Sequence, residues 1–255
     1  MNPAARDLYA SIAVALARIA AARVSDRSVH EARRALKRAR AALRLLRPGL
    51  DPAAYRAQNA LLRDAGRSLA PLREARAARD ALRDLQRRWP EARGTSLPIR
   101  PAAPRAASRP AVEAMLRSAL VRAAQRDFEE IAPAKLGTGL RRIYRKGRHA
   151  LAAARKSGEE DALHEWRKHV KYLANGLRVL FGEAPEAKVI RRAERLADRL
   201  GEAHDLALLS AREPALEPFA GKRRAKLRKR AFALGRKLYR QKPKRFLAER
   251  PTSSS

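Results

Sequence analysis

An internal repeat constrains the fold of this 255-residue chain more than any other feature of its sequence. The segment VHEARRALKRARAALRLL (Val29–Leu46) aligns without a gap with LHEWRKHVKYLANGLRVL (Leu163–Leu180). The identical pairs are His30 with His164, Glu31 with Glu165, Arg33 with Arg167, Lys37 with Lys171, Leu43 with Leu177, Arg44 with Arg178 and Leu46 with Leu180. A second pair of similar segments follows, Arg67–Ala77 and Asp198–Leu208. The unit is too long for a short solenoid repeat and occurs too few times for an array, so the pattern indicates two similar helical halves.

The composition predicts an all-α fold. Alanine and arginine, which favour helices, are abundant, whereas the β-branched and aromatic residues that favour strands are scarce. The sequence shows no Gly-rich phosphate loop and no alternation of strands with helices. We expect helices over residues 7–24, 28–46, 52–69, 72–88, 111–131, 135–156, 161–181, 187–200, 204–212 and 222–240.

A proline-rich segment separates the two halves. WPEARGTSLPIRPAAPRAASRP (89–110) predicts a linker, because proline blocks the continuation of a helix. We therefore expect a single domain over residues 1–255, with an N-terminal helical half at 5–88 and a C-terminal half at 111–250. The last residues, 251–255, are predicted to form a disordered tail.

The charge of the chain predicts a polyanionic partner. The formal net charge is +33 at pH 7, and self-repulsion on this scale destabilises the compact state. Candidate partners are nucleic acid, an anionic membrane surface and a polymer of phosphate. The chain has no cysteine, which excludes disulfides, thiolate chemistry and cysteine-type zinc sites. Charged residues interrupt the apolar N-terminal stretch, which favours an amphipathic helix over a signal peptide, and no run is long enough to span a membrane. We expect a cytoplasmic protein with no membrane partner.

At 100° per residue, each copy of the repeated helix has one apolar stripe and one cationic stripe. The cationic stripes hold His30, Arg33, Arg34, Lys37 and Arg44, with Arg38 and Arg40 at the margins, in the first copy, and His164, Arg167, Lys168, Lys171 and Arg178 in the second. Like charges on one helix face repel each other, and a solvated face has no reason to repeat them in the same register. The repeat therefore favours a binding face. The further basic segment 221–245 is either a general basic surface or a part of the same site.

The side chains of the cationic stripes are better suited to phosphate than to bases. Proteins that bind single-stranded nucleic acid use aromatic platforms for stacking, but only 5% of the residues here are aromatic. Arginine offers a bidentate fork to phosphate oxygens, lysine a mobile point charge, and histidine a donor whose pKa bound phosphate would raise. These properties favour a polymer of phosphate alone. The alternative that remains open is a protein that binds and compacts nucleic acid without specificity.

The pattern H-x-x-R-[KR]-x-x-K-[RY], present twice in a basic helix, resembles the motif of the CHAD family (conserved histidine α-helical domain). The segments IYRKGRHALAAA, LAPLREA, LGEAHDLALL and RKLYRQKPKRFLAER also resemble this family, so the resemblance covers about residues 5 to 250. It implies two four-helix bundles related by a pseudo-twofold axis, with a cationic groove or pore between them. It also implies binding of inorganic polyphosphate and association with polyphosphate granules. We expect a stand-alone domain, without the triphosphatase-type CYTH domain to which family members are often fused.

The resemblance also implies which residues line the groove. The matching residues are His30, Arg33, Arg34, Lys37 and Arg38 in the first half and His164, Arg167, Lys168 and Lys171 in the second. Arg73 and His204 match the next basic position of the family, and Tyr172 replaces the cation that Arg38 supplies in the first half. Further candidate contacts from the basic faces are Arg44, Arg145, Arg148 and Arg178. Expected ligands are polyphosphate, with phosphate or sulfate ions as mimics, and polyphosphate-metabolising enzymes are candidate partners.

The same pattern argues against catalysis. In both motifs the glutamate directly follows the histidine, so on a helix it points about 100° away from it. The histidines do not have the i, i+4 spacing of a two-histidine zinc site. The cationic stripes also lack the converging carboxylates that a divalent-metal phosphatase requires. We therefore expect a protein that binds its ligand without catalysis and needs no metal or cofactor.

Overall fold

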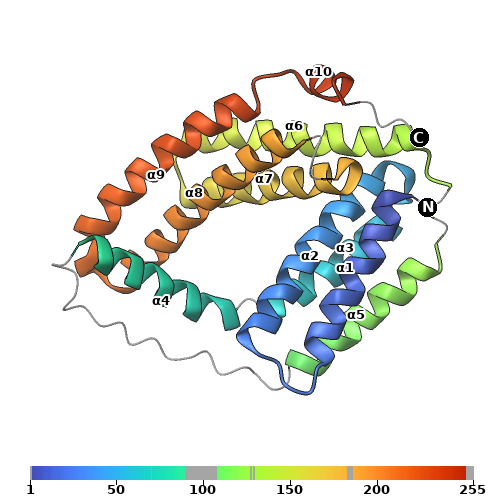
Figure 1. Cartoon of the computed structure of the whole chain (residues 1–255), viewed down its shortest axis with the longest axis horizontal. Coiled ribbons are helices and arrows are strands. Elements are labelled where there is room, and N and C mark those ends of the chain that lie inside the picture. Colours follow the sequence, from blue (N-terminus) through green and yellow to red (C-terminus); the bar gives the residue numbers. More distant parts are fainter. Residues whose placement is uncertain are drawn as a thin grey trace.

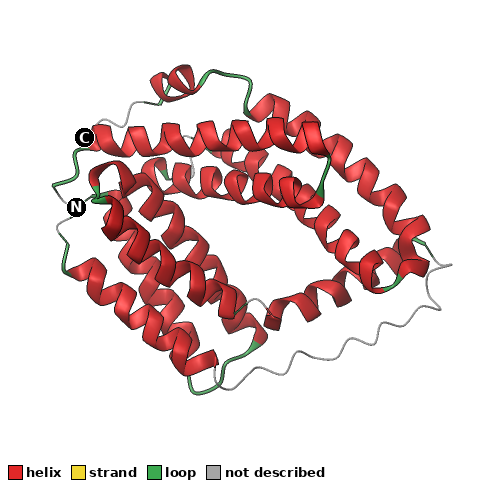
Figure 2. Cartoon of the chain, turned by 180° about the vertical axis from the view of Figure 1, so that it is seen from behind, coloured by secondary structure: helices red, strands yellow, loops and turns green. Residues whose placement is uncertain are grey.

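The computed structural model describes residues 2–69, 71–89, 108–126, 128, 130–182 and 186–250, without the side chains of residues 71–79 and 108. Within these residues it contains helices and no strand, so the prediction of an all-α fold is confirmed (Figure 2). The helices are α1 (Pro3–Ala20), α2 (Asp26–Leu46), η1 (Arg47–Gly49), α3 (Pro52–Ser68), α4 (Pro71–Arg88), α5 (Ser108–Ala124), α6 (Pro133–Ser157), α7 (Glu160–Phe181), α8 (Ala187–Arg212), η3 (Pro214–Leu216), α9 (Glu217–Leu238) and α10 (Pro243–Ala248).

Most predicted helices are present, and their ends follow from capping. The side chain of Asn2 accepts hydrogen bonds from the backbone at the start of α1, and Ser25 and Asp51 do the same for α2 and α3. The α7 helix ends at Phe181, next to Gly182, as predicted. Residues 21–24, 125, 126, 128, 130 and 131, which the sequence assigns to helices, lie beyond the ends of α1 and α5.

Two predicted boundaries were wrong. The helices expected at 187–200 and 204–212 form one helix, α8, because Gly201 costs only about 1 kcal/mol in a helix and buried leucines flank it. The linker predicted at 89–110 overlaps α5, which begins at Ser108 and holds Pro110 in its first turn, where proline is tolerated. The rest of that linker, 90–107, and the tail at 251–255 lie outside the described residues. The short helix α10 was not predicted.

The helices pack in two groups that do not follow the two halves of the sequence. In the first group α1 packs on α2, and α5 packs on both α1 and α3 (Figure 1). In the second group α6, α7, α8 and α9 pack on one another in chain order, and α4 lies against α8. The helix before the linker, α4, therefore packs with the second group, and the helix after it, α5, packs with the first. The apolar face of α4 explains why this helix lies against α8. Its residues Leu82 and Leu85 join a separate apolar cluster with Leu206, Leu209 and Leu227 of α8 and α9.

The two repeated helices, α2 and α7, lie against each other where the groups meet. Their apolar stripes are buried as predicted; Leu43 and Leu46 of α2 and Trp166 and Leu177 of α7 are inaccessible to solvent. The α6 helix also crosses α2 closely at Gly139, where a Cβ atom would lie 2.3 Å from the backbone oxygen of Leu45. This packing fixes the cationic stripes of α2 and α7 side by side. No described helix has the length and apolar character that crossing a bilayer requires.

Candidate functional site

The cationic stripes of α2 and α7 meet in a pocket with a volume of about 370 Å³, here called the cationic pocket. Its third wall is α3. The lining residues are Arg33, Leu36, Lys37 and Arg40 of α2, Leu62, Arg63, Gly66 and Arg67 of α3, and His164, Arg167, Lys168, Lys171 and Tyr172 of α7. No carboxylate is among the described residues that line it. Of the predicted groove residues, the pocket thus brings together Arg33 and Lys37 from the first repeat with His164, Arg167, Lys168 and Lys171 from the second.

The two aligned arginines of the repeat, Arg33 and Arg167, make similar backbone contacts. Arg33 donates from Nη1 to the carbonyl oxygen of Gly66 on α3, at 2.7 Å, and Arg167 donates from Nε to the carbonyl oxygen of Ala197 on α8, at 3.3 Å. Gly66 and Ala197 immediately precede the second pair of similar segments, so these two contacts are equivalent. Each carbonyl anchors one nitrogen of a guanidinium group in the wall of the pocket.

A glycine leaves room for Arg167. A Cβ atom at Gly201 on α8 would lie 2.6 Å from Nη2 of Arg167, closer than side chains approach each other. The guanidinium group therefore lies close to the backbone of α8 at the edge of the pocket. Gly201 positions Arg167 without itself presenting a donor to a ligand.

Two histidine rings lie next to each other at the α7–α8 side of the pocket. The ring centroids of His164 and His204 are 4.9 Å apart, and the Nδ1 atoms of both are buried without a hydrogen-bond partner. Burial lowers the pKa of His164 below its ordinary value, and the neighbouring His204 and Lys168 lower it further. A bound anion would act in the opposite direction and raise this pKa.

Two predicted groove residues are instead held by carboxylates. Arg38 donates to Asp7 of α1, and Arg178 donates to Glu194 of α8. Neither lines the cationic pocket. Both carboxylates lie far from the motif in sequence, which is why the sequence pattern alone placed these arginines in the groove.

Other predicted residues lie around the pocket rather than in it. Arg34 and Arg145 are exposed, and Arg148 is exposed and donates to the backbone oxygen of Gln241 at 3.3 Å. Arg44 stacks on the ring of Tyr172, which lines the pocket. Arg73 lies on α4, and its side chain is outside the described residues. Lys168 lines the pocket but is also paired with Glu165.

The pocket also contains cations that the sequence analysis did not assign to the groove. Arg63 and Arg67 of α3 line it, as does Arg40 of α2, which was expected only at the margin of the cationic stripe. The available signal was the i, i+4 spacing of the two arginines on α3, shortly after the first repeat. Arg63 makes a two-point contact with Asp64, at 2.8 and 2.9 Å, and this hydrogen bond is the main cause of the lowered pKa of Asp64.

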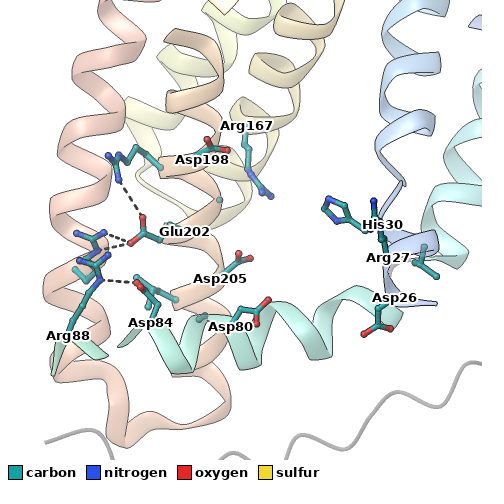
Figure 3. Close-up of a pocket in the computed structure, with 16 residues that line it drawn as sticks. Asp26, Arg27, His30, Asp80, Asp84, Arg88, Arg167, Asp198, Glu202 and Asp205 are labelled. Atoms are coloured by element: carbon teal, nitrogen blue, oxygen red, sulfur yellow. Dashed lines mark hydrogen bonds and ion pairs between the residues drawn. The ribbon is translucent and has the colours of Figure 1, made fainter. Parts of the chain in front are cut away.

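A larger cavity of about 790 Å³ opens beside the cationic pocket and has mixed charge. Figure 3 shows His30 on α2 and Arg167 on α7 facing this space, and Arg167 lines both cavities. Carboxylates also line it; they are Asp26, Asp80, Asp84, Asp198, Glu202 and Asp205. Some are paired, as Asp84 is with Arg88 at 2.9 Å. The cationic character expected of a central groove thus belongs to the smaller pocket.

The model of the CHAD domain family matches residues 6–213 of the chain, which include both copies of the repeat. The chain belongs to the CHAD domain family. No curated protein and no solved structure gives a significant match.

In this CHAD domain the matched region ends within one residue of the end of α8, so it contains every described helix that lines the cationic pocket. The paired histidine motifs on which the resemblance rested lie at the junction of the two helix groups. Among the described residues, no group of three or more His, Asp or Glu side chains is arranged to hold a metal ion.

Proposed function

We propose that this CHAD domain binds inorganic polyphosphate in the cationic pocket between α2, α3 and α7. The observation that carries the proposal is the lining of the pocket, in which cations from both repeated motifs converge and no described carboxylate takes part. Bringing like charges together lowers the stability of the free protein, and an anion of high charge density offsets that cost.

The chemistry of the pocket supports phosphate in particular. Arg33 and Arg167 are each anchored by a backbone carbonyl, which reduces the side-chain entropy that a ligand must fix. The lysines add mobile charge around these fixed forks. Tyr172 is the aromatic residue among the described lining residues, and Arg44 covers its ring, so the pocket offers no open platform for a base.

In this proposal binding is not followed by catalysis, and no cofactor takes part. Polyphosphate then directs the protein to polyphosphate granules in the cytoplasm, where polyphosphate-metabolising enzymes are its expected neighbours. The alternative function is non-specific binding of nucleic acid, which the net charge of +33 would also support.

A competition experiment separates the two functions. Labelled long-chain polyphosphate is bound to the protein and challenged with duplex DNA at equal total phosphate charge, over a range of salt concentrations. We expect the DNA to displace little polyphosphate, because the pocket fits a chain without bases, and both affinities to fall as salt rises. Efficient displacement by DNA at equal charge would support the nucleic-acid function instead.

A further inference from the structure

A second group of cations lies beside the cationic pocket and is not part of its lining. It consists of Arg44 at the end of α2, Arg47 of η1, and Arg142, Arg145 and Lys146 of α6. None of the five forms an ion pair with a described carboxylate. We call these residues the α6 cluster.

The charges of the α6 cluster are close enough to affect each other. Desolvation lowers the pKa of Lys146, and the charges of Arg142 and Arg47 lower it further. The pKa of Arg142 is also lowered, first by desolvation and then by Arg47 and Arg145. The Nε atom of Arg142 is buried and has no hydrogen-bond partner. A folded protein that keeps cations together in this way carries an energetic cost that an anion would remove.

Two tyrosines hold two of the arginines of the α6 cluster, Arg44 and Arg47, in place. The guanidinium group of Arg44 lies 3.8 Å from the ring centroid of Tyr172, and that of Arg47 lies 4.5 Å from the ring centroid of Tyr55. Both rings are buried, so these contacts fix the positions of the charges without neutralising them. Because Tyr172 also lines the cationic pocket, the α6 cluster begins where the pocket ends.

The opposite end of the cationic pocket is unfavourable for a polyanion. There Arg167 borders the larger cavity, whose walls include Asp26, Asp198 and Asp205. A chain of phosphates that leaves the pocket in this direction meets carboxylates, whereas in the other direction it meets Arg44 and the α6 cluster.

We propose that the α6 cluster is a second anion subsite, which binds the phosphates that follow those held in the cationic pocket and so favours long polyphosphate chains over short ones. The inference rests on the proposed function and adds the direction of the chain and a length preference. A ligand that spans two linked sites gains affinity through the effective concentration of its second part, whereas tripolyphosphate occupies one site at a time.

The test compares long-chain polyphosphate with tripolyphosphate by titration calorimetry. The variant is the double substitution Arg142→Gln with Lys146→Gln, and its matched control is Arg117→Gln with Arg122→Gln, two exposed arginines of α5. We expect the double variant to lower the ratio of long-chain to tripolyphosphate affinity by at least about tenfold, which is about 1.4 kcal/mol. The control should leave the ratio unchanged.

Stability gives an independent readout, because loss of mutual repulsion should leave the melting temperature of the double variant equal to or above that of the wild type. If the double variant does not fold, Lys146→Gln alone, at an exposed side chain, should lower the ratio in the same direction. An unchanged ratio, with normal binding by the wild type, would overturn the subsite and leave the cationic pocket standing. Failure of the wild type to bind either ligand would overturn both proposals.

Discussion

The two copies of the repeat share a motif but differ in what surrounds it. Arg33 of α2 and Arg167 of α7 make equivalent contacts with backbone carbonyls of the helices that follow, and both line the cationic pocket. The histidines of the two copies lie in different surroundings. His30 is exposed in the larger, mixed-charge cavity, whereas His164 is half-buried in the cationic pocket and lies next to the tilted ring of His204.

The difference continues towards the C-terminal ends of the two helices. Arg44 of α2 stacks on Tyr172 and contacts no described carboxylate, whereas its counterpart Arg178 of α7 is paired with Glu194. Tyr172 itself occupies the position that Arg38 has in α2. A repeat in sequence therefore need not give a symmetric distribution of charge, because carboxylates from other helices pair with different positions in the two copies, Arg38 in α2 and Arg178 in α7.

The largest change in polyphosphate affinity is expected from the arginines that the two copies share, Arg33 and Arg167. Arg33→Gln and Arg167→Gln should each weaken polyphosphate binding by at least about tenfold, because each removes a charge-assisted hydrogen bond, worth roughly 1–3 kcal/mol, from the same pocket. Affinity is measured by titration calorimetry at fixed salt. The control is Arg117→Gln, which removes the same charge from the exposed face of α5.

Thermal unfolding of the same variants separates binding from folding, since each arginine also bonds to a carbonyl. If Arg33→Gln, Arg167→Gln and the control Arg117→Gln all bind polyphosphate equally well, the shared pocket does not exist and the protein attracts polyanions by net charge alone. If only one of the two helix variants is affected, the equivalence of the repeats does not extend to binding.

A smaller effect is expected at the glycine that makes room for Arg167. Gly201→Ala should lower affinity severalfold, because the added methyl group displaces the guanidinium group. Helix propensity favours alanine over glycine by about 1 kcal/mol, so the melting temperature should be unchanged or higher. The control is Gly176→Ala on α7, outside the lining of the pocket, where a Cβ atom would make an ordinary contact, 3.5 Å from Cδ1 of Ile143. Equal affinities for the two alanine variants would show that the position of Arg167 does not matter.

The sequence was sufficient to predict the features that depend on local periodicity. The apolar stripes of α2 and α7 follow from residues such as Leu43 and Leu177, and both are buried as expected. The exchange of α4 and α5 was not predictable, because it depends on which apolar faces meet after a linker. The third wall of the pocket, with Arg63, and the pairing of Arg38 with Asp7 likewise depend on helices brought together by tertiary packing.

The smallest expected effect is a difference between His30 and His164 in how they contribute to the pH dependence of polyphosphate affinity. Burial lowers the pKa of His164 in the free protein, and phosphate bound in the same pocket would raise it. The complex then binds more protons than its free components, so affinity should increase as pH falls through the pKa that His164 has in the complex. The increase should level off below the pKa that His164 has in the free protein, which lies under the ordinary histidine value of about 6.5. A shift of half a pKa unit corresponds to about a threefold change in affinity.

His164→Gln should therefore flatten the increase in affinity between about pH 8 and about pH 5.5, whereas His30→Gln should retain most of it, because His30 faces the cavity with carboxylates. Both variants are titrated with the same long-chain polyphosphate, so protonation of the ligand contributes equally to both curves and cancels in the comparison. Salt is held constant, since screening would otherwise change both affinities. Identical pH profiles for the two variants would mean that the histidines are equivalent in solution, and the asymmetry between the repeats would then be confined to their arginines.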